Sequence, residues 1–181
     1  MKSRINALCA GLAIAALAPA CTSLKGDAQP GTTVQLEARS GSKVKGTLTL
    51  REQQDGVLIS GDISGLMPNK AHGFHVHEKG DCSAPDATSA GPHFNPAGAP
   101  HGKAWSGPHH AGDMPNLETD NWGVAHVSIV VAGATLSPGP SSIAGRAIVV
   151  HRDPDDYATQ PAGNAGPRIA CGVIPGTAAT K

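Results

Sequence analysis

The chain has 181 residues and no formal net charge, with 23 Gly and 15 Pro but only two Phe, one Tyr and two Trp. Its length suits one domain, and its neutral balance gives no reason to expect a nucleic acid or an anionic membrane surface as partner. A core must come from Val, Ile, Leu and Ala, and the abundant Gly and Pro predict turns and long loops rather than long helices.

The first twenty residues differ from the rest of the chain. Lys2 and Arg4 precede an apolar run that ends in small residues and is too short for a comfortable membrane span, INALCAGLAIAALAPA. This order is typical of a secretory signal peptide, which we predict at 1–20; a buried N-terminal helix is the alternative. Cleavage would remove two basic residues and no acidic one, leaving a net charge of −2.

The cysteines indicate two possible outcomes of such a cleavage. The shortened chain would keep Cys21, Cys82 and Cys171, an odd number that is awkward in an oxidising compartment. Any one pair leaves a third cysteine over, and Cys21 would stand where a bacterial lipoprotein carries its lipid. The preceding LAPA matches a lipobox only loosely, so lipidation and ordinary cleavage both stay open. We therefore expect export to the periplasm, with membrane attachment through Cys21 as one outcome.

Residues 21–32 are expected to form a flexible tether, 33–176 a folded domain and 177–181 a tail. Apolar and polar residues alternate at 32–38, 43–50, 56–63 and 71–77, and turn-rich spacers separate the early runs. Strand patterns resume at 116–120, 123–131, 144–151 and 168–173. Without any convincing helix, this pattern predicts an all-β fold, an eight-stranded antiparallel sandwich or flattened barrel.

Two long segments, 79–115 and 152–167, show neither strand nor helix periodicity. The first is far longer than an ordinary connection, so it is either functional or disordered. It is tied down by strands at both ends and concentrates imidazoles and a carboxylate, which favours function. These residues are His93, His101, His109, His110 and Asp113.

The strand expected at 71–77 contains His75, Val76 and His77. Side chains in a strand alternate between faces, so the two imidazoles share one face. A chance pair facing solvent is one interpretation. A metal site is the more specific interpretation, because neutral imidazole is the commonest protein ligand for copper and zinc.

The other candidate ligands indicate which metals are involved. Imidazole together with a carboxylate suits zinc, and a turn can bring His110 and Asp113 onto one ion. Imidazole alone, from His75, His77 and a strand-end His151, suits copper. Seven candidate ligands are too many for one tetrahedral site, so two neighbouring metals are predicted.

Five segments, in this order, resemble the copper/zinc superoxide dismutases. They are GFHVHEKGDC, SAGPHFNP, the spacing of His101, His110 and Asp113, GRAIVVH and GNAGPRIACGVI. Together they span roughly residues 33–174, and the resemblance implies a Greek-key arrangement of the eight strands. Cys82 follows GD directly and stands eleven residues before His93, a placement that resembles the exported bacterial branch of that family.

The resemblance implies a role for each candidate ligand. One copper and one zinc per chain would share an imidazolate bridge. The implied ligands are, for copper, His75, His77 and His151; for both metals, His93; and for zinc, His101, His110 and Asp113. Asp155 would be the carboxylate that links a copper histidine to a zinc histidine and so fixes both rings.

The resemblance also implies residues outside the ligand set. Arg168 would line the approach to copper, with hydrogen bonding to backbone carbonyls as its alternative role. Cys82 and Cys171 would form a disulfide. The loop from His151 to Cys171 is short, which puts in doubt the acidic and basic residues that steer substrate in the cytosolic branch. Lys79 and Lys103 are the nearby lysines that could substitute for them.

Three histidines stay outside the implied ligand set. His72 is expected to bond backbone groups, and His126 to be solvated on an outer strand. His109 neighbours His110 and is the alternative ligand at that place.

The implied function is dismutation of superoxide to oxygen and hydrogen peroxide, which would protect the cell envelope. A non-catalytic copper-binding or copper-delivery protein on the same sandwich is the alternative, because a fold does not fix a function. A zinc hydrolase would need an open metal position and a general base such as Glu78. The assembly, monomer or homodimer, stays open.

Overall fold

The structure, a computed structural model, describes residues 31–176. The expected signal peptide, Cys21 and the tail 177–181 lie outside the described residues. In chain order the elements are β1 (Thr32–Ala38), β2 (Lys45–Gln53), β3 (Gly56–Ser64), β4 (Ala71–His72), β5 (Phe74–His77), a short 3₁₀ turn η1 (Thr88–Ala90), β6 (Leu117–Glu118), β7 (Ala125–Ala132), β8 (Ala147–His151) and β9 (Arg168–Val173).

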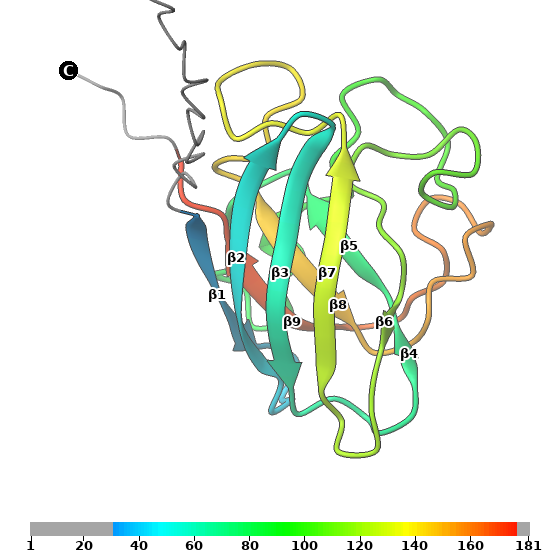
Figure 1. Cartoon of the computed structure of the whole chain (residues 1–181). Coiled ribbons are helices and arrows are strands. Elements are labelled where there is room, and N and C mark those ends of the chain that lie inside the picture. The colour runs from blue at the N-terminus through cyan, green and yellow to red at the C-terminus, as the bar shows by residue number, and fades with distance from the viewer. Residues whose placement is uncertain (1–30, 177–181) are drawn as a thin grey trace, which may run out of the picture.

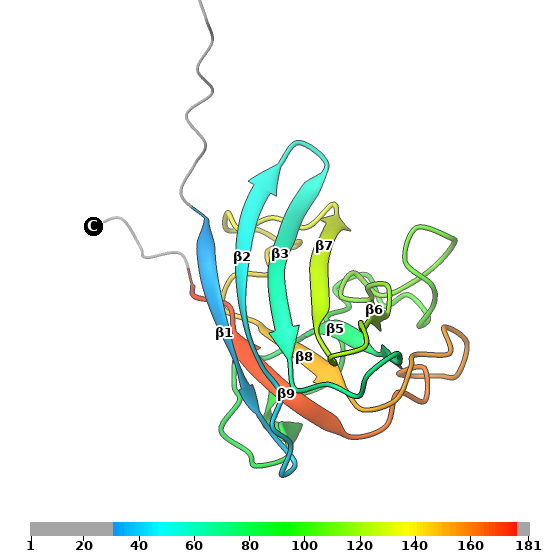
Figure 2. The same cartoon turned by 60° about the horizontal axis from the view of Figure 1, so that its bottom comes forward.

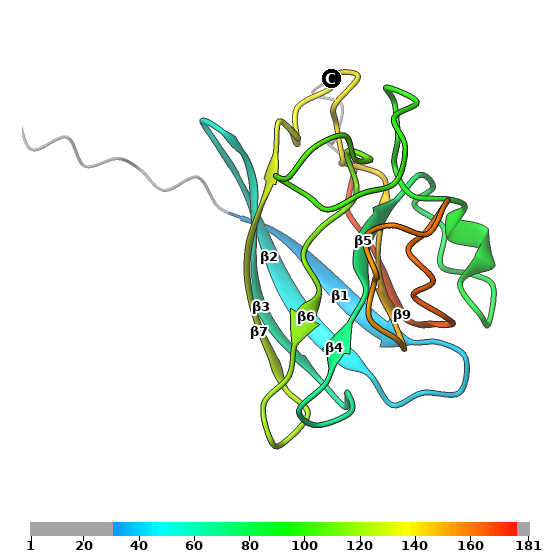
Figure 3. The same ribbon diagram turned by 90° about the vertical axis from the view of Figure 1, so that its right-hand side faces the viewer.

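Seven strands form one antiparallel sheet in the order β5-β8-β9-β1-β2-β3-β7 (Figure 1). The sheet curls so that β2, β3 and β7 form one layer and β5, β8 and β9 the other (Figure 3). β1 joins the layers, because Thr32–Leu36 pairs with β2 whereas Glu37 and Ala38 pair with β9. The all-β prediction is confirmed, and the flattened barrel is open along one side.

The core lies between the two layers and follows the alternation of the strands. Val34 and Leu36 of β1 and Leu48 and Leu50 of β2 point inward and are almost completely buried. Their neighbours along each strand face solvent. Complete burial of one such side chain contributes about 1.5–3 kcal/mol, so the alternating pattern both forms the strands and holds the layers together.

The strand expected at 71–77 is divided at Gly73 into β4 and β5. Gly73 donates its N–H to the carbonyl of Asp153 and accepts the N–H of His151. The chain therefore changes partners: β4 pairs with β6 in a separate two-stranded sheet, and β5 pairs with β8. The expected strand at 116–120 is also shorter, since only Leu117–Glu118 pairs.

The outer face of β8 and β9 is covered by the loop that follows β5. Ala147, Val149 and Cys171 form a second, small apolar cluster with Ala87 and Ala90 of that loop. For this reason every residue of β8 is buried, although the strand lies at the surface of the sandwich. The disulfide between Cys82 and Cys171 fastens the loop to β9, as predicted.

The two long irregular loops lie at one side of the sandwich. Part of the loop between β5 and β6 lies beside the loop between β8 and β9, on the right of Figures 1 and 2. Within residues 31–176, no helix is long and apolar enough to cross a membrane.

Candidate metal centre

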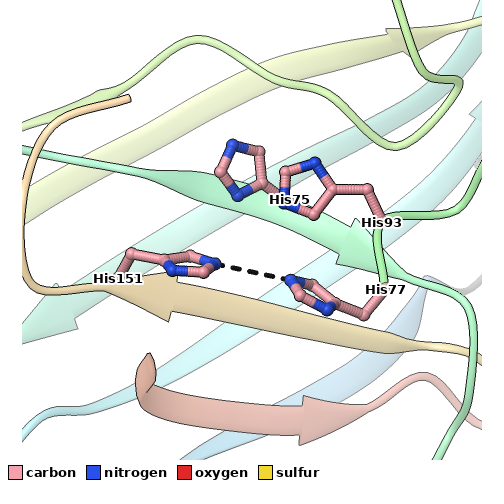
Figure 4. Close-up of side chains that lie close together, drawn as sticks. All are labelled: His75, His77, His93 and His151. Atoms are coloured by element: carbon pink, nitrogen blue, oxygen red, sulfur yellow. Dashed lines mark hydrogen bonds between the residues drawn. The ribbon is translucent and has the colours of Figure 1, made fainter. Parts of the chain in front are cut away.

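β5 presents two histidines on its outer face. His75 and His77 point outward, while Phe74 and Val76 of the same strand belong to the main core. Across the β5–β8 pair, His75 lies opposite Val149 and His77 opposite Ala147. His151 is two residues beyond Val149 on β8, and the three imidazoles therefore share a face (Figure 4).

The free edge of β5 is where the first long loop adds its ligands. Phe94 donates its N–H to the carbonyl of Val76 at 2.8 Å, and Val76 donates to the carbonyl of Gly112 at 2.9 Å. These bonds place His93 beside His77 and Asp113 beside His75 as isolated bridges. Gly112 is needed for this approach, because a Cβ there would collide with the carbonyl oxygen of Val76.

Four imidazoles form the first ligand group. One ring nitrogen from each imidazole lies within 4.8 Å of those from the other three, and all four residues are buried. Figure 4 shows two of the rings on β5, one at the end of β8 and one on the loop. The members are His75, His77, His93 and His151.

The hydrogen bonds of this group fix where its lone pairs point. Nδ1 of His77 donates to the carbonyl of Gly91 at 2.8 Å, and Nδ1 of His151 donates to that of Gly166 at 3.1 Å. In the neutral ring the other nitrogen then carries only a lone pair. The two Nε2 atoms face each other at 3.4 Å, a repulsive contact that a bound cation would turn into coordination.

Burial keeps these rings neutral. It lowers the pKa of His75 and of His77 well below the usual value of 6.5, and the other imidazoles nearby lower it further. Burial likewise lowers the pKa of His151 to about 4. At neutral pH these three rings are therefore uncharged, which is the form of imidazole that binds a metal.

Three imidazoles and a carboxylate form the second group, which is also buried. The members are His93, His101, His110 and Asp113. In each ring Nδ1 lies near the carboxylate of Asp113: 2.8 Å for His93, 3.0 Å for His101 and 3.3 Å for His110. Donors from three different parts of the loop therefore converge on one point.

Asp113 stays ionised in this buried position. Burial alone would raise its pKa, but hydrogen bonds from His93 and from the backbone N–H groups of His110 and Gly102 outweigh burial and hold the pKa well below the usual range. The N–H groups of His110 and Gly102 both donate to Oδ2, at 2.9 and 3.1 Å. A charged carboxylate is thus available to the second group.

Asp155 connects the two groups. Its Oδ2 accepts a hydrogen bond from Nε2 of His75 at 2.8 Å, and its Oδ1 accepts one from Nε2 of His101 at 2.9 Å. Each ring consequently turns an Nδ1 lone pair away from Asp155 and toward its own ligand group. Gly163 allows the contact, because a Cβ there would strike both the carboxylate of Asp155 and the ring of His101.

The donor sets fit copper and zinc. Within the described residues, Nδ1 of His75, Nε2 of His93 and Nδ1 of His101 are buried without a hydrogen-bond partner. For His101 this lone pair faces a carboxylate oxygen at 3.0 Å, an arrangement that a cation stabilises. Four neutral imidazoles suit copper, and three imidazoles with a carboxylate suit zinc.

A cavity of about 610 Å³ opens onto both groups. Its wall includes His77, His93, His110 and His151, together with Arg168. Arg168 lies opposite His151 across β8 and β9 and also donates Nη1 to the carbonyl of Ala87 at 2.7 Å. Both roles considered for this arginine are therefore compatible with its position.

A second guanidinium, Arg146, lines the same cavity and was missed from the sequence. It stacks 3.6 Å from the ring centroid of Phe94, next to His93 in the chain, and donates Nη1 to the carbonyl of Glu78. Lys79 and Lys103, expected as substitutes for steering residues, are not among the residues that line this cavity. The motif GRAIVVH contained the signal, since Arg146 is its only cation.

The remaining histidines lie apart from the two groups. His72 is buried and its Nδ1 donates to the carbonyl of His151, so the expected backbone contact is confirmed. His109 is half-buried and its Nδ1 donates to the carbonyl of Gly107, whereas His110 is buried and turns toward Asp113. His126 has a side chain that is 71% exposed and pairs with Asp62.

Comparisons with known proteins agree with this site. The family model for copper/zinc superoxide dismutase matches residues 44–174. Superoxide dismutase [Cu-Zn] 2 of Aquifex aeolicus is 46% identical over 136 residues, which are 73% of this chain and 80% of that protein. Superoxide dismutase [Cu-Zn] 1 of the same organism is 43% identical over 147 residues, 79% and 86% of the two chains.

Solved structures show the same fold. The crystal structure of a SOD-like protein from Bacillus subtilis has a TM-score of 0.72 and 38% identity, covering 80% of this chain and 99% of the other. A double mutant of that protein, in which a Tyr and a Pro are replaced by His, has a TM-score of 0.74 and 41% identity, covering 81% and 99%.

Proposed function

Because the chain belongs to the copper/zinc superoxide dismutase family, we propose that its copper and zinc share one imidazole and that it acts in the cell envelope. As a member of the family it is a superoxide dismutase that uses copper and zinc. Two superoxide ions and two protons become one oxygen and one hydrogen peroxide. The alternatives of copper delivery and zinc hydrolysis are set aside on this ground.

The proposed copper ligands are the first group. His77 and His151 would bind through Nε2, because each commits Nδ1 to a backbone carbonyl. His75 would bind through Nδ1, since its Nε2 is bonded to Asp155. His93 would supply its Nε2, which is buried and has no hydrogen-bond partner in the described part of the chain.

The proposed zinc ligands are the second group, with Nδ1 of His93, His101 and His110 and the carboxylate of Asp113 as donors. The convergence of these atoms on Asp113 supports this assignment. The observation that carries the whole proposal is that His93 belongs to both groups. Its Nδ1 lies against Asp113 while its Nε2 remains free for the other group.

When bound, copper alternates between two oxidation states and supplies the redox chemistry, whereas zinc does not change its oxidation state. The residues of the chain position substrate and protons. Arg168 would attract the superoxide anion into the cavity. Nε2 of His93 would hold a proton only while it is not bound to copper, and would give that proton to the peroxide that leaves. Asp155 keeps His75 and His101 in the required orientation.

Metal content and superoxide removal, measured on one purified sample, test the proposal. We expect one copper and one zinc per chain in the parent protein. His93→Ala should lower the affinity for both metals and abolish activity, because one ring serves both groups. His109→Ala is the matched control, because His109 donates to the carbonyl of Gly107 and belongs to neither ligand group, so its loss should change neither metal content nor activity. Loss of only one metal from His93→Ala would argue against a shared imidazole.

The envelope location rests on the N-terminal sequence and on the disulfide. A signal peptide at 1–20 would export the chain, and the bond between Cys82 and Cys171 suits an oxidising compartment. Cys21 is the proposed lipid attachment site. Cys21→Ser should move the protein from the membrane fraction to the soluble periplasmic fraction. If the parent protein is already soluble and unmodified, Cys21 is not lipidated and the signal peptide is removed by ordinary cleavage.

A further inference from the structure

The two long loops hold each other through side-chain amides. We call residues 79–116 the first loop and residues 152–167 the second loop; both carry groups of the metal centre, His101 and Asp155 respectively. The loops lie side by side in Figures 1 and 2. In each loop, one side-chain amide forms two hydrogen bonds with the backbone N–H and carbonyl of a single residue in the opposite loop. We call each such pair of hydrogen bonds a grip.

Gln160 of the second loop grips His101. The backbone N–H of His101 donates to Oε1 of Gln160 at 2.8 Å, and Nε2 of Gln160 donates to the carbonyl of His101 at 2.8 Å. One planar amide thus satisfies both backbone groups of a single residue. Because His101 stands in an irregular segment without strand or helix partners, this contact fixes its backbone in place.

Asn116 of the first loop grips Asp155 in the same way. The backbone N–H of Asp155 donates to Oδ1 of Asn116 at 2.9 Å, and Nδ2 of Asn116 donates to the carbonyl of Asp155 at 3.0 Å. The N–H of Asn116 also donates to the hydroxyl of Tyr157 at 2.8 Å. The grip is therefore reciprocal: each loop holds the backbone of a metal-centre residue in the other.

The two gripped residues are themselves bonded to each other. Nε2 of His101 donates to Oδ1 of Asp155 at 2.9 Å. Asn116, Asp155, His101 and Gln160 therefore form one continuous series of contacts that crosses between the loops three times. Both amides are neutral, so they hold the loops without adding a charge that would compete for a metal.

We propose that Gln160 and Asn116 are positioning residues for the zinc site, which they assemble by locking the two loops together before metal binds. This inference rests on the proposed zinc ligands. If the two loops are already ordered, zinc binding does not have to meet the conformational-entropy cost of ordering them. The contacts between the loops therefore raise the affinity for zinc. Gln160 is an exposed residue, and its truncation leaves the hydrophobic core intact.

Zinc and copper affinities, measured separately by competition with a chelator, provide the test. Gln160→Ala should weaken zinc binding about tenfold, at the lower end of the range for residues that orient ligands, while copper affinity changes by less than about threefold. Asn116→Ala should weaken both, because Asp155 touches His75 as well as His101. Gln53→Ala, at an exposed position on β2, is the matched control.

An isosteric variant separates the effect of the hydrogen bonds of Gln160 from the effect of its side-chain volume. Gln160→Glu keeps the acceptor for the N–H of His101 but places an oxygen against its carbonyl in place of the donor. Zinc affinity should fall at least as far as in Gln160→Ala. Exchange of the His101 amide hydrogen in the metal-free protein should accelerate in both variants, while amides of β2 and β3 keep the parent rates.

The double variant of Gln160→Ala and Asn116→Ala tests whether the grips act as one lock. If they do, the combined loss of zinc affinity is smaller than the product of the single losses. Parent zinc affinity in Gln160→Ala, or a combined loss equal to that product, would overturn the lock. His101→Ala tests the underlying assignment of His101 as a zinc ligand. If that variant binds zinc as tightly as the parent, the ligand assignment is wrong, and the proposed role of Gln160 and Asn116 is wrong with it.

Discussion

The interior between the two sheet layers and the metal centre are both buried, but the side chains that fill them are of opposite chemical character. Between the layers the interior is formed by aliphatic side chains, such as Leu48 and Ile59 at 0% exposure. At the metal centre the interior is polar. Every buried polar side chain of residues 31–176 belongs to the two groups or contacts them: His72, His75, His77, His93, His101, His110, Asp113, His151 and Asp155.

This contrast indicates what each region requires for its stability. Apolar burial stabilises the sheet whether or not a metal is bound. At the metal centre, lone pairs face one another or a carboxylate, as between His77 and His151 at 3.4 Å, and such contacts are unfavourable without a cation. The sheet should therefore tolerate loss of the metals, whereas the two loops should not.

The largest effect is expected from His151→Ala, which breaks the metal centre and spares the sheet. One of four copper donors is lost, so copper content and superoxide removal should fall to background. The sheet should remain folded, because His151 lies on its outer face and the core side chains of β8 are untouched. Copper analysis, activity and circular dichroism on one sample would show this, and full activity would refute the copper assignment.

Loss of the disulfide should weaken the region where the loops meet the sheet. Cys82 and Cys171 are 89 residues apart, and a cross-link over such a span stabilises by about 4–5 kcal/mol in the chain-entropy model. Replacing both residues by Ser should lower the free energy of unfolding by up to that amount. Denaturant titration of the metal-loaded protein measures it. A loss below about 1 kcal/mol would show that η1 and its apolar cluster hold the loop unaided.

Leu48→Ala is the converse of the copper-site variant, because it breaks the sheet and spares the metal centre. Leu48 is completely buried in β2, opposite Gly61 of β3. Truncating a buried leucine costs about 2–5 kcal/mol, depending on how far the cavity closes. Copper and zinc stoichiometry should stay at the parent level under conditions where the variant is folded. Metal loss from folded protein would show that the two regions are coupled.

Acid should affect the metal centre before it affects the sheet. The folded pKa of His151 is about 4, against 6.5 for an ordinary histidine. A depressed histidine pKa means that the unfolded chain binds more protons, so stability is fully present above pH 6.5 and is lost as pH falls toward 4. Urea titrations of the metal-free protein at pH 7.5, 6 and 5 should give falling stabilities. A flat profile would contradict neutral, buried imidazoles.

The sequence predicted these two regions to different depths. Alternation at 32–38 and 56–63 predicted β1 and β3 almost to the residue, because one face of each strand is apolar. The division at Gly73 could not be predicted, since it depends on backbone bonds to residues 151 and 153, far along the chain. Periodicity alone did not indicate which strands pair, and the Greek-key topology came from the family resemblance.

The ligand histidines were recognisable because imidazoles at fixed spacing have few other uses. Their supporting residues were not recognisable in this way. Gln160 and Asn116 act through amides that contact backbone atoms, and any loop can contain an Asn or a Gln. Arg146 was overlooked for a related reason: its place in the cavity depends on its stacking on Phe94, a contact between two irregular segments that are far apart in the chain.

The smallest expected effect concerns Arg168, at the entrance to the metal centre. If the proposed signal peptide is removed, the chain has a net charge of −2 and should repel superoxide as a whole, so attraction must be local. Arg168 lines the cavity with Arg146, and focusing of this kind raises association rates by roughly 10–1000-fold. Arg168→Ile should lower the second-order rate constant roughly tenfold, the lower end of that range, and flatten its decline with ionic strength.

The alternative is that Arg168 serves only to hold the carbonyl of Ala87. Arg152→Ile is the matched control, because it removes the same charge from an exposed side chain that is paired with Asp153 and does not line the cavity. Arg168→Lys should restore part of the rate, since charge matters more than fork geometry for a small diffusing anion. If copper occupancy is unchanged and Arg168→Ile keeps the parent's rate and salt dependence, Arg168 holds the loop and does not steer substrate.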